Sequence, residues 1–159
     1  MSSQVLSYQA HAAWTAFLRG HAALTRELNA QLVADHGLTI NDYEVLLRLA
    51  RAPDRRMKRV ELAQSVLLTP SGITRLLDGL EAAGFVEKAF CDTDARVTYA
   101  ALTDAGREKL GEAGTSHIAD NERVFNARFD TSELGTLAEL LGRLGGEGGA
   151  EECTPPDAA

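Results

Sequence analysis

The chain has 159 residues and a formal net charge of -7, with 45% hydrophobic and 25% charged residues. These values are typical of one soluble globular domain that is large enough to bury a core. No run of about eighteen apolar residues and no secretory signal pattern occurs, and two cysteines outside any CxxC pattern fit a reducing cytosol. We therefore expect a cytoplasmic protein with no membrane association.

The negative charge is concentrated near the C-terminus. Residues 100–159 hold 12 acidic and 5 basic side chains, whereas residues 55–99 hold 7 basic and 6 acidic ones. An acidic total therefore does not exclude a nucleic-acid interface in the middle third of the chain.

Two helices are predicted in the first third. Apolar residues recur at steps of three and four from Trp14 to Leu32, which predicts a long helix that ends at Gly37. Thr39 and Asp42 have the spacing of a capping box and predict the start of a second helix, which the PDRRMK run closes.

A pair of short helices comes next, RVELAQSV (59–66) and TPSGITRLLDGLEAAG (69–84). Thr69 is a good N-cap, proline follows it at the first turn, and Gly84 is a natural stop. The second helix has one apolar face and one polar face at helical spacing. The apolar face holds Ile73, Leu76, Leu77 and Leu80, and the polar face holds Ser71, Thr74, Arg75 and Asp78.

After Gly84, the pattern predicts a β-hairpin and then two more helices. FVEKAF (85–90) and RVTYAAL (96–102) read as strands joined by the turn CDTDA, and Thr103 caps a long helix. Asp130 and Glu133 form a capping box for a last helix, and residues 146–159 read as a disordered tail. The fold class is therefore mainly α with a small β-hairpin wing: a winged helix-turn-helix flanked by long helices. These flanking helices have more apolar surface than one small module can cover, which predicts a homodimer.

The polar face of the 69–84 helix is the main functional signal. In a helix-turn-helix the second helix enters the major groove, where Ser71 and Thr74 can bond phosphates or bases and Arg75 can grip guanine. Arg96, just past the hairpin turn, can enter the narrow minor groove while Asp94 holds its side chain. Any surface helix has a polar face, however, and an Asp–Arg pair at a hairpin tip can be a purely local contact.

Two stretches together resemble the MarR family of bacterial transcriptional regulators. They are LTPSGITRLLDGLEAAGFVEK and DTDARVTYAALTDAG, and GLTINDYEVLLRLA resembles the family's second helix. The family pattern D-x-R, five variable residues, then L-T-x-x-G falls on Asp94, Arg96, Leu102, Thr103 and Gly106. The resemblance spans about residues 10–145.

The resemblance implies a dimeric protein that binds double-stranded DNA at pseudo-palindromic operators, most often as a repressor that a small, often phenolic, ligand releases. It implies an N-terminal dimerisation helix (1–34), a DNA-binding lobe (35–102) and C-terminal dimerisation helices (103–145). The DNA-binding residues would be Thr69, Ser71, Thr74, Arg75, Lys88, Asp94 and Arg96. Family members often carry more arginines in the wing than this chain, where Lys88 and two alanines occupy the stretch, which predicts a shallower salt dependence of binding.

The effector site is less well defined by the sequence. The family's ligand pocket lies between the first, second and fifth helices, where Trp14, His21, Tyr43 and His117 offer rings or polar tips. The same pattern is the ordinary one for core or interface residues. The four histidines have no metal-ligand spacing, so we expect no metal and no cofactor.

Two other functional classes stay open. Phosphate loops, nucleophile elbows and HExxH helices are absent from the sequence, which argues against an enzyme. The alternative function is a dimeric winged-helix module that contacts proteins and does not bind specific DNA. The sequence names neither the operator nor the effector.

Overall fold

The computed structural model describes residues 2–66, 68–90 and 97–144 of the chain. Helices dominate these ranges, as the sequence predicts, and a small sheet lies among them. The elements are α1 (Ser2–His36), α2 (Ile40–Arg51), a 3-10 turn η1 (Pro53–Arg55), β1 (Arg56–Lys58), α3 (Arg59–Ser65), α4 (Pro70–Ala82), β2 (Val86–Phe90), β3 (Thr98–Leu102), α5 (Asp104–Asn126) and α6 (Thr131–Gly142).

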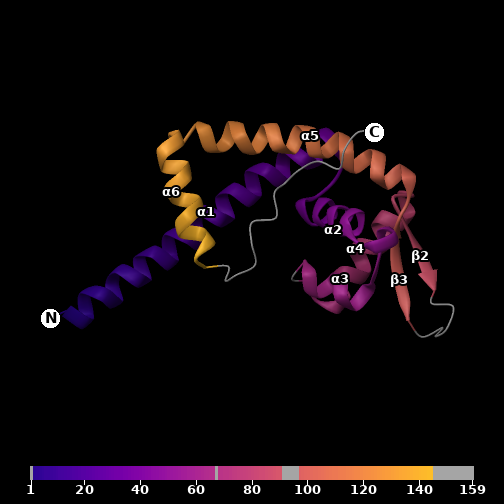
Figure 1. The fold of residues 1–159 in the computed structure, drawn as a ribbon, viewed down its shortest axis with the longest axis horizontal. Coiled ribbons are helices and arrows are strands. Elements are labelled where there is room, and N and C mark those ends of the chain that lie inside the picture. Colours follow the sequence, from indigo (N-terminus) through magenta and orange to yellow (C-terminus); the bar gives the residue numbers. More distant parts are fainter. Residues whose placement is uncertain (1, 67, 91–96, 145–159) are drawn as a thin grey trace.

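The elements form two regions (Figure 1). The long helices α1 and α5 pack against each other, and α6 turns back from the far end of α5. Helices α2, α3 and α4 gather with the sheet into a lobe at the other end, and α2 joins the two regions because it contacts both α1 and α5. None of the helices in the described ranges has the length and hydropathy that a bilayer crossing requires.

Local capping sets most of the helix ends. Asp42 N donates to Thr39 Oγ1 at 3.1 Å, and Thr39 N donates to Asp42 Oδ2 at 2.8 Å, so the predicted capping box starts α2. The second predicted box, Asp130 with Glu133, starts α6 in the same way. Gly37 and Gly84 follow α1 and α4 with positive φ angles of 69° and 79°, which glycine adopts without strain.

The sheet has three strands rather than the predicted two. Its order is β1-β3-β2, with both pairs antiparallel, and Arg56 lies opposite Ala101 while Lys58 lies opposite Tyr99. Helix α2 ends before the basic run, as predicted, and Arg56–Lys58 within that run form an edge strand that the sequence did not predict. The described wing strands are also shorter than predicted, because β2 begins at Val86 and β3 at Thr98.

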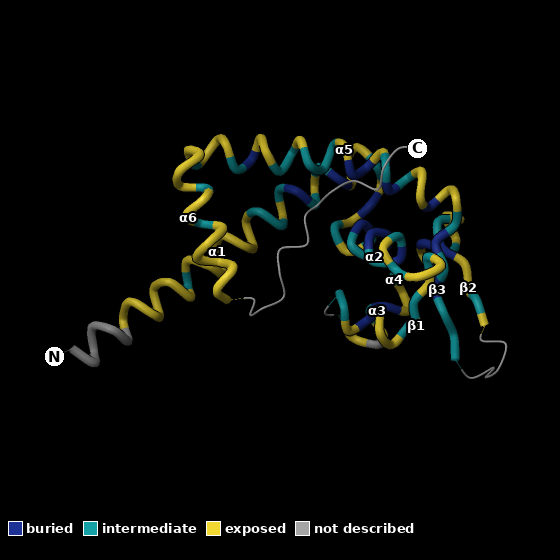
Figure 2. Tube along the Cα trace, viewed as in Figure 1, coloured by how far each residue is buried: buried dark blue, intermediate teal, exposed yellow. Residues whose placement is uncertain are grey.

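The core lies inside the lobe and extends to the first half of α5 (Figure 2). The predicted apolar face of α4 is confirmed, since Ile73, Leu77 and Leu80 are buried and Leu76 is half-buried. They pack with buried residues of α2, α3 and α5. The largest fully buried side chains are Leu46, Leu49, Leu62, Leu77, Leu110, Val45 and Val124.

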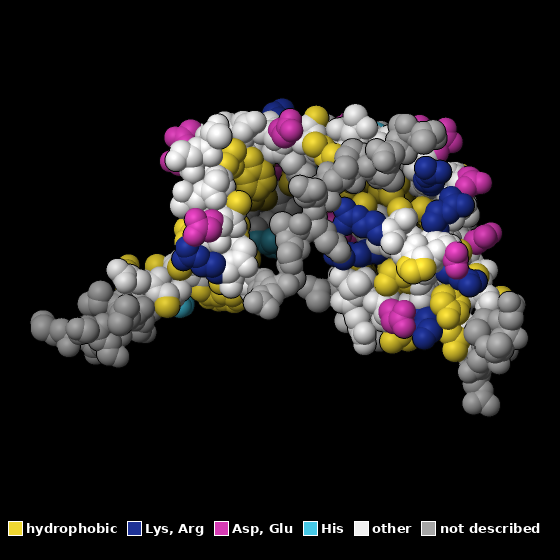
Figure 3. Space-filling model, in the orientation of Figure 1, with side chains coloured by type: hydrophobic (Ala, Val, Ile, Leu, Met, Phe, Trp, Pro, Cys, Tyr) yellow, Lys and Arg dark blue, Asp and Glu magenta, His cyan; other side chains and the backbone are white. Residues whose placement is uncertain are grey.

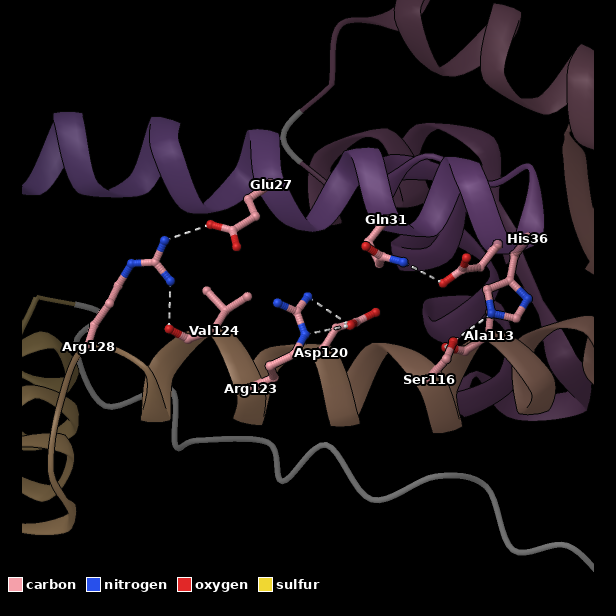
Figure 4. Close-up of polar contacts among 10 residues, drawn as sticks. Glu27, Gln31, His36, Ala113, Ser116, Asp120, Arg123, Val124 and Arg128 are labelled. Carbon is pink, nitrogen blue, oxygen red and sulfur yellow. Dashed lines mark hydrogen bonds and ion pairs between the residues drawn. The ribbon is translucent and has the colours of Figure 1, made fainter.

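Two polar contacts drawn in Figure 4 join α1 to α5 and to the turn that follows α5. Near the α6 end, Arg128 Nη2 donates to Glu27 Oε2 at 2.7 Å, and its Nη1 donates to the Val124 carbonyl. Near the lobe, the imidazole of His36 bonds the hydroxyl of Ser116. These pairs hold the two long helices in one relative register.

Candidate nucleic-acid interface

Helix α4 presents the predicted polar face to solvent. Ser71, Thr74, Arg75 and Asp78 are all exposed, whereas the opposite face is buried in the lobe. Burial of that apolar face fixes the rotation of α4 about its axis, so the polar side chains must point outward. The structure therefore brings together, on one exposed face, the three α4 residues predicted to read DNA.

The first turn of α4 is suited to a phosphate group. Thr69 Oγ1 accepts a hydrogen bond from Gly72 N at 3.1 Å and lies 3.3 Å from Ser71 Oγ. Two hydroxyls thus stand at the positive end of the helix dipole. A helix N-terminus of this kind binds phosphate readily.

The wing is described only at its base. Lys88 on β2 is half-exposed, and its Nζ lies 3.2 Å from Glu81 Oε2 at the end of α4. This ion pair neutralises part of the charge that Lys88 offers to DNA, and it links the wing to α4. Asp94 and Arg96 lie outside the described residues, so the predicted wing-tip contact stays a prediction.

The L-T-x-x-G motif joins the wing to α5. Thr103 caps α5 by accepting a bond from Gly106 N at 3.0 Å, and Thr103 Oγ1 donates to the Gly84 carbonyl at 2.7 Å. Thr103 N donates to the Phe85 carbonyl at 3.1 Å. The first turn of α5 is therefore bonded directly to the chain that leaves α4.

Gly106 is required by close packing at this joint. A Cβ atom at this position would lie 2.0 Å from the Phe85 carbonyl oxygen and 2.8 Å from Leu102 Cδ1. No side chain fits there without displacing backbone. Gly106 lies within helix α5, so this position does not need the backbone freedom of glycine. Glycine is required here because there is no room for a side chain.

A basic segment that sequence reasoning did not single out lies in the same lobe. Residues 48–59 hold six arginines and lysines and one aspartate, the densest positive run in an acidic chain. On the face shown in Figure 3, most Lys and Arg side chains gather over this lobe. The charge density of the run, taken on its own, could have identified it.

The four predicted effector residues fall into two groups. Tyr43 is buried, and its ring centroid lies 4.9 Å from that of His117, which is half-buried. Burial lowers the pKa of His117 below 6.5, against the opposing effect of the Asp120 and Glu44 carboxylates. Trp14 and His21 are exposed farther along α1, where each ring lies 6.2 Å from that of Phe17. The effector site stays a prediction.

Within the described residues, no group of three or more His, Cys, Asp or Glu side chains could hold a metal ion.

Comparison with known proteins finds transcriptional regulators with this fold. Residues 36–97 match a family model described as MarR family. The HTH-type transcriptional repressor YetL of Bacillus subtilis is 31% identical over 111 residues, which span 70% of this chain and 66% of YetL. The uncharacterised HTH-type regulator YkoM of the same species is 30% identical over 112 residues, 70% of each chain.

Solved structures agree with the sequence relatives. Sco3205, a MarR family regulator from Streptomyces coelicolor solved in complex with DNA, superposes with a TM-score of 0.76 at 27% identity, covering 85% of this chain and 84% of its own. AbsC from the same organism superposes with a TM-score of 0.73 at 28% identity, covering 85% of this chain and 90% of its own.

Proposed function

Because the chain belongs to the MarR family of DNA-binding transcriptional regulators, we propose that it is a homodimeric repressor of a pseudo-palindromic operator. The exposed polar face of α4 carries this proposal. In the proposed complex, two copies of α4 enter successive major grooves about 34–36 Å apart. The structure solved with DNA and the relative named as a repressor support this reading.

The DNA contacts divide by chemistry. Arg75 is the exposed cation of the α4 face and is able to grip guanine O6 and N7 in the major groove. Thr69 and Ser71 hold a phosphate at the helix N-terminus, which positions the lobe without reading sequence. The wing, through Arg96, enters the adjacent minor groove.

The apolar surface of α1 and α6 supports the dimer. Trp14 is 58% exposed on α1 and Leu144, just beyond α6, is 71% exposed. Further exposed apolar residues on the same two helices are Phe17, Leu18, Leu140 and Leu141. Exposed apolar side chains that cluster in this way mark an interface between protein surfaces, and a second copy of the chain would bury them.

Release by a ligand is the third part of the proposal. The junction of α1, α2 and α5 is the place where a small molecule can change the angle between the lobe and the dimerisation helices, and Tyr43 and His117 lie at it. The dimer would have two conformations that differ in this angle, and only one of them fits the operator. A ligand that binds the other conformation more tightly shifts the dimer away from its operator-bound form.

Binding to DNA is tested by fluorescence anisotropy with the region upstream of the chain's own gene and with random DNA of equal length. Titrations at two salt concentrations separate phosphate contacts from base contacts. Light scattering gives the mass of the protein in the same buffer. A preference for the upstream region by a dimer supports the proposal. A dimer with equal affinity for both DNAs supports instead the protein-interaction module.

A further inference from the structure

Helices α3 and α4 border a crevice on the lobe. The two helices pack against each other (Figure 1), and a hydrogen bond of 3.0 Å from Leu68 N to the Ala63 carbonyl fixes the turn between them. The crevice has a volume of about 380 Å³, and four residues of α3, Leu68 of the turn, and Ile73 and Thr74 of α4 line it. Thr74 also belongs to the exposed polar face of α4, so the crevice adjoins the surface that is proposed to enter the major groove.

Most of the crevice is apolar. Ala63 and Ile73 belong to the buried core, and Leu68 is half-buried against it. Val60, in the first turn of α3, is 71% exposed although it is a large apolar side chain. Apolar surface of this kind, next to a charged or polar rim, marks a place of contact with another molecule.

The single cation of the lining is Arg59, which begins α3 and is half-buried. Its Nη2 atom is buried and has no hydrogen-bond partner among the described residues. Glu61, the only carboxylate of α3, pairs with Lys58 at 3.4 Å. A guanidinium stays charged in proteins, and a buried N–H group without an acceptor costs free energy. An anion at the crevice would supply the acceptor that Arg59 lacks.

The dimensions of DNA place the crevice against a backbone strand. An α-helix with its side chains is about 10–12 Å across, and the major groove is about 12 Å wide. A helix in the groove therefore fills it, and the elements that flank the helix lie against the sugar–phosphate strands. In a helix-turn-helix the first helix crosses the backbone, and here that helix is α3.

We propose that the crevice holds one sugar–phosphate unit of the operator, with Arg59 on the phosphate and Val60 against the deoxyribose. The inference rests on the proposed function and gives each lobe a second attachment to the backbone, separate from the first turn of α4. Arginine binds phosphate oxygens through charge-assisted bonds in paired geometry. Backbone contacts fix the register of a protein on DNA without reading sequence, so this contact would set the position from which Arg75 meets a base.

The first test compares Arg59→Gln with Arg107→Gln, which removes an exposed cation of α5 outside the crevice. Anisotropy titrations use the region upstream of the chain's own gene and random DNA, each at several salt concentrations. In a dimer, Arg59→Gln should reduce the steepness of log affinity against log salt by about two, since each lost phosphate contact removes about 0.9. It should weaken binding to both DNAs by the same factor, whereas Arg107→Gln should keep the wild-type slope.

The two DNAs separate this inference from the proposed function. If the wild type binds both DNAs equally, the sequence-specific regulator is wrong, yet a reduced slope of Arg59→Gln on random DNA still supports the backbone contact. If the wild type prefers the upstream region and Arg59→Gln keeps its slope, the proposed function stands and the crevice contact is overturned. A loss of affinity for the upstream region alone would make Arg59 a base-reading residue and would also overturn the inference.

Val60 gives a second test that does not alter Arg59. Val60→Asp places a carboxylate against the proposed sugar–phosphate unit, and Val60→Asn has nearly the same shape without the charge. Both variants should unfold at the wild-type midpoint in circular dichroism, because Val60 is exposed. Val60→Asp should bind either DNA at least about tenfold more weakly than Val60→Asn at low salt, because like charges repel, and the difference should shrink at high salt. Equal affinities of the two variants would place the DNA backbone elsewhere and overturn the proposal.

Discussion

Gly106→Ala should strongly destabilise the protein, because the added Cβ meets backbone. The atom would lie 2.0 Å from the Phe85 carbonyl oxygen, whereas carbon and oxygen atoms pack no closer than about 3.3 Å. The first turn of α5 must then move by about 1.3 Å relative to Phe85. That movement breaks the bonds from Thr103 N and Thr103 Oγ1 to the Phe85 and Gly84 carbonyls.

The expected magnitude follows from these losses. Two hydrogen bonds contribute about 1 kcal/mol each, overpacking costs about 1–3 kcal/mol, and the higher helix propensity of alanine returns about 1 kcal/mol. The free energy of unfolding should therefore fall by about 2–4 kcal/mol. Urea unfolding followed by circular dichroism, at one fixed protein concentration, measures the change.

The same substitution five residues later is the matched control. A Cβ at Gly111, within the same helix, meets nothing within 4 Å. Gly111→Ala should therefore stabilise the protein by about 0.5–1 kcal/mol, because alanine loses less backbone entropy in a helix. If the two variants differ by less than about 1 kcal/mol, the close contact with Phe85 is not the reason for glycine in the motif.

Three further predictions address binding, assembly and pH. Arg75→Ala should weaken operator binding by about 1–3 kcal/mol and relax the base preference at one position of each half-site, as measured by anisotropy with single-base operator variants. Trp14→Glu with Leu18→Glu should convert the dimer to a monomer in light scattering, since both residues are exposed apolar groups on α1; an unchanged mass would place the interface elsewhere. Burial lowers the pKa of His117 below the ordinary imidazole value of 6.5, so the unfolded chain takes up a proton first as the pH falls. Stability should therefore decrease as the pH falls below about 6.5, and His117→Phe should remove that component of the pH dependence in urea titrations.

The features that the sequence predicts correctly are those set by neighbours along the chain. The N-caps at Thr39, Thr69 and Thr103 each depend on a donor three residues ahead, and a pattern of apolar residues at three- and four-residue steps orients α4. Such signals are local, so a single sequence contains them. The polar face of α4, and with it most of the candidate DNA site, could be predicted for this reason.

Features that depend on distant partners could not be predicted. Strand β1 exists because Arg56–Lys58 pair with Tyr99–Ala101, more than forty residues away, and the three residues carry no strand pattern of their own. Likewise, periodicity predicts that Trp14 and Tyr43 both face inward, yet within one chain Tyr43 is buried and Trp14 is exposed. The proposed dimer would supply the missing partner of α1, and a single sequence does not contain that information.

Because Thr103 is hydrogen-bonded to the chain that follows α4, a tilt of α5 also moves the end of α4. The helix has 23 residues, so it is about 34 Å long at 1.5 Å per residue. A tilt of 3° about its α6 end displaces its first turn by about 1.8 Å by this geometry. The joint passes that movement directly to the end of α4. In the proposed DNA complex, a shift of this size is enough to move an α4 side chain off a base edge, because the hydrogen bonds to that edge tolerate only a few tenths of an ångström.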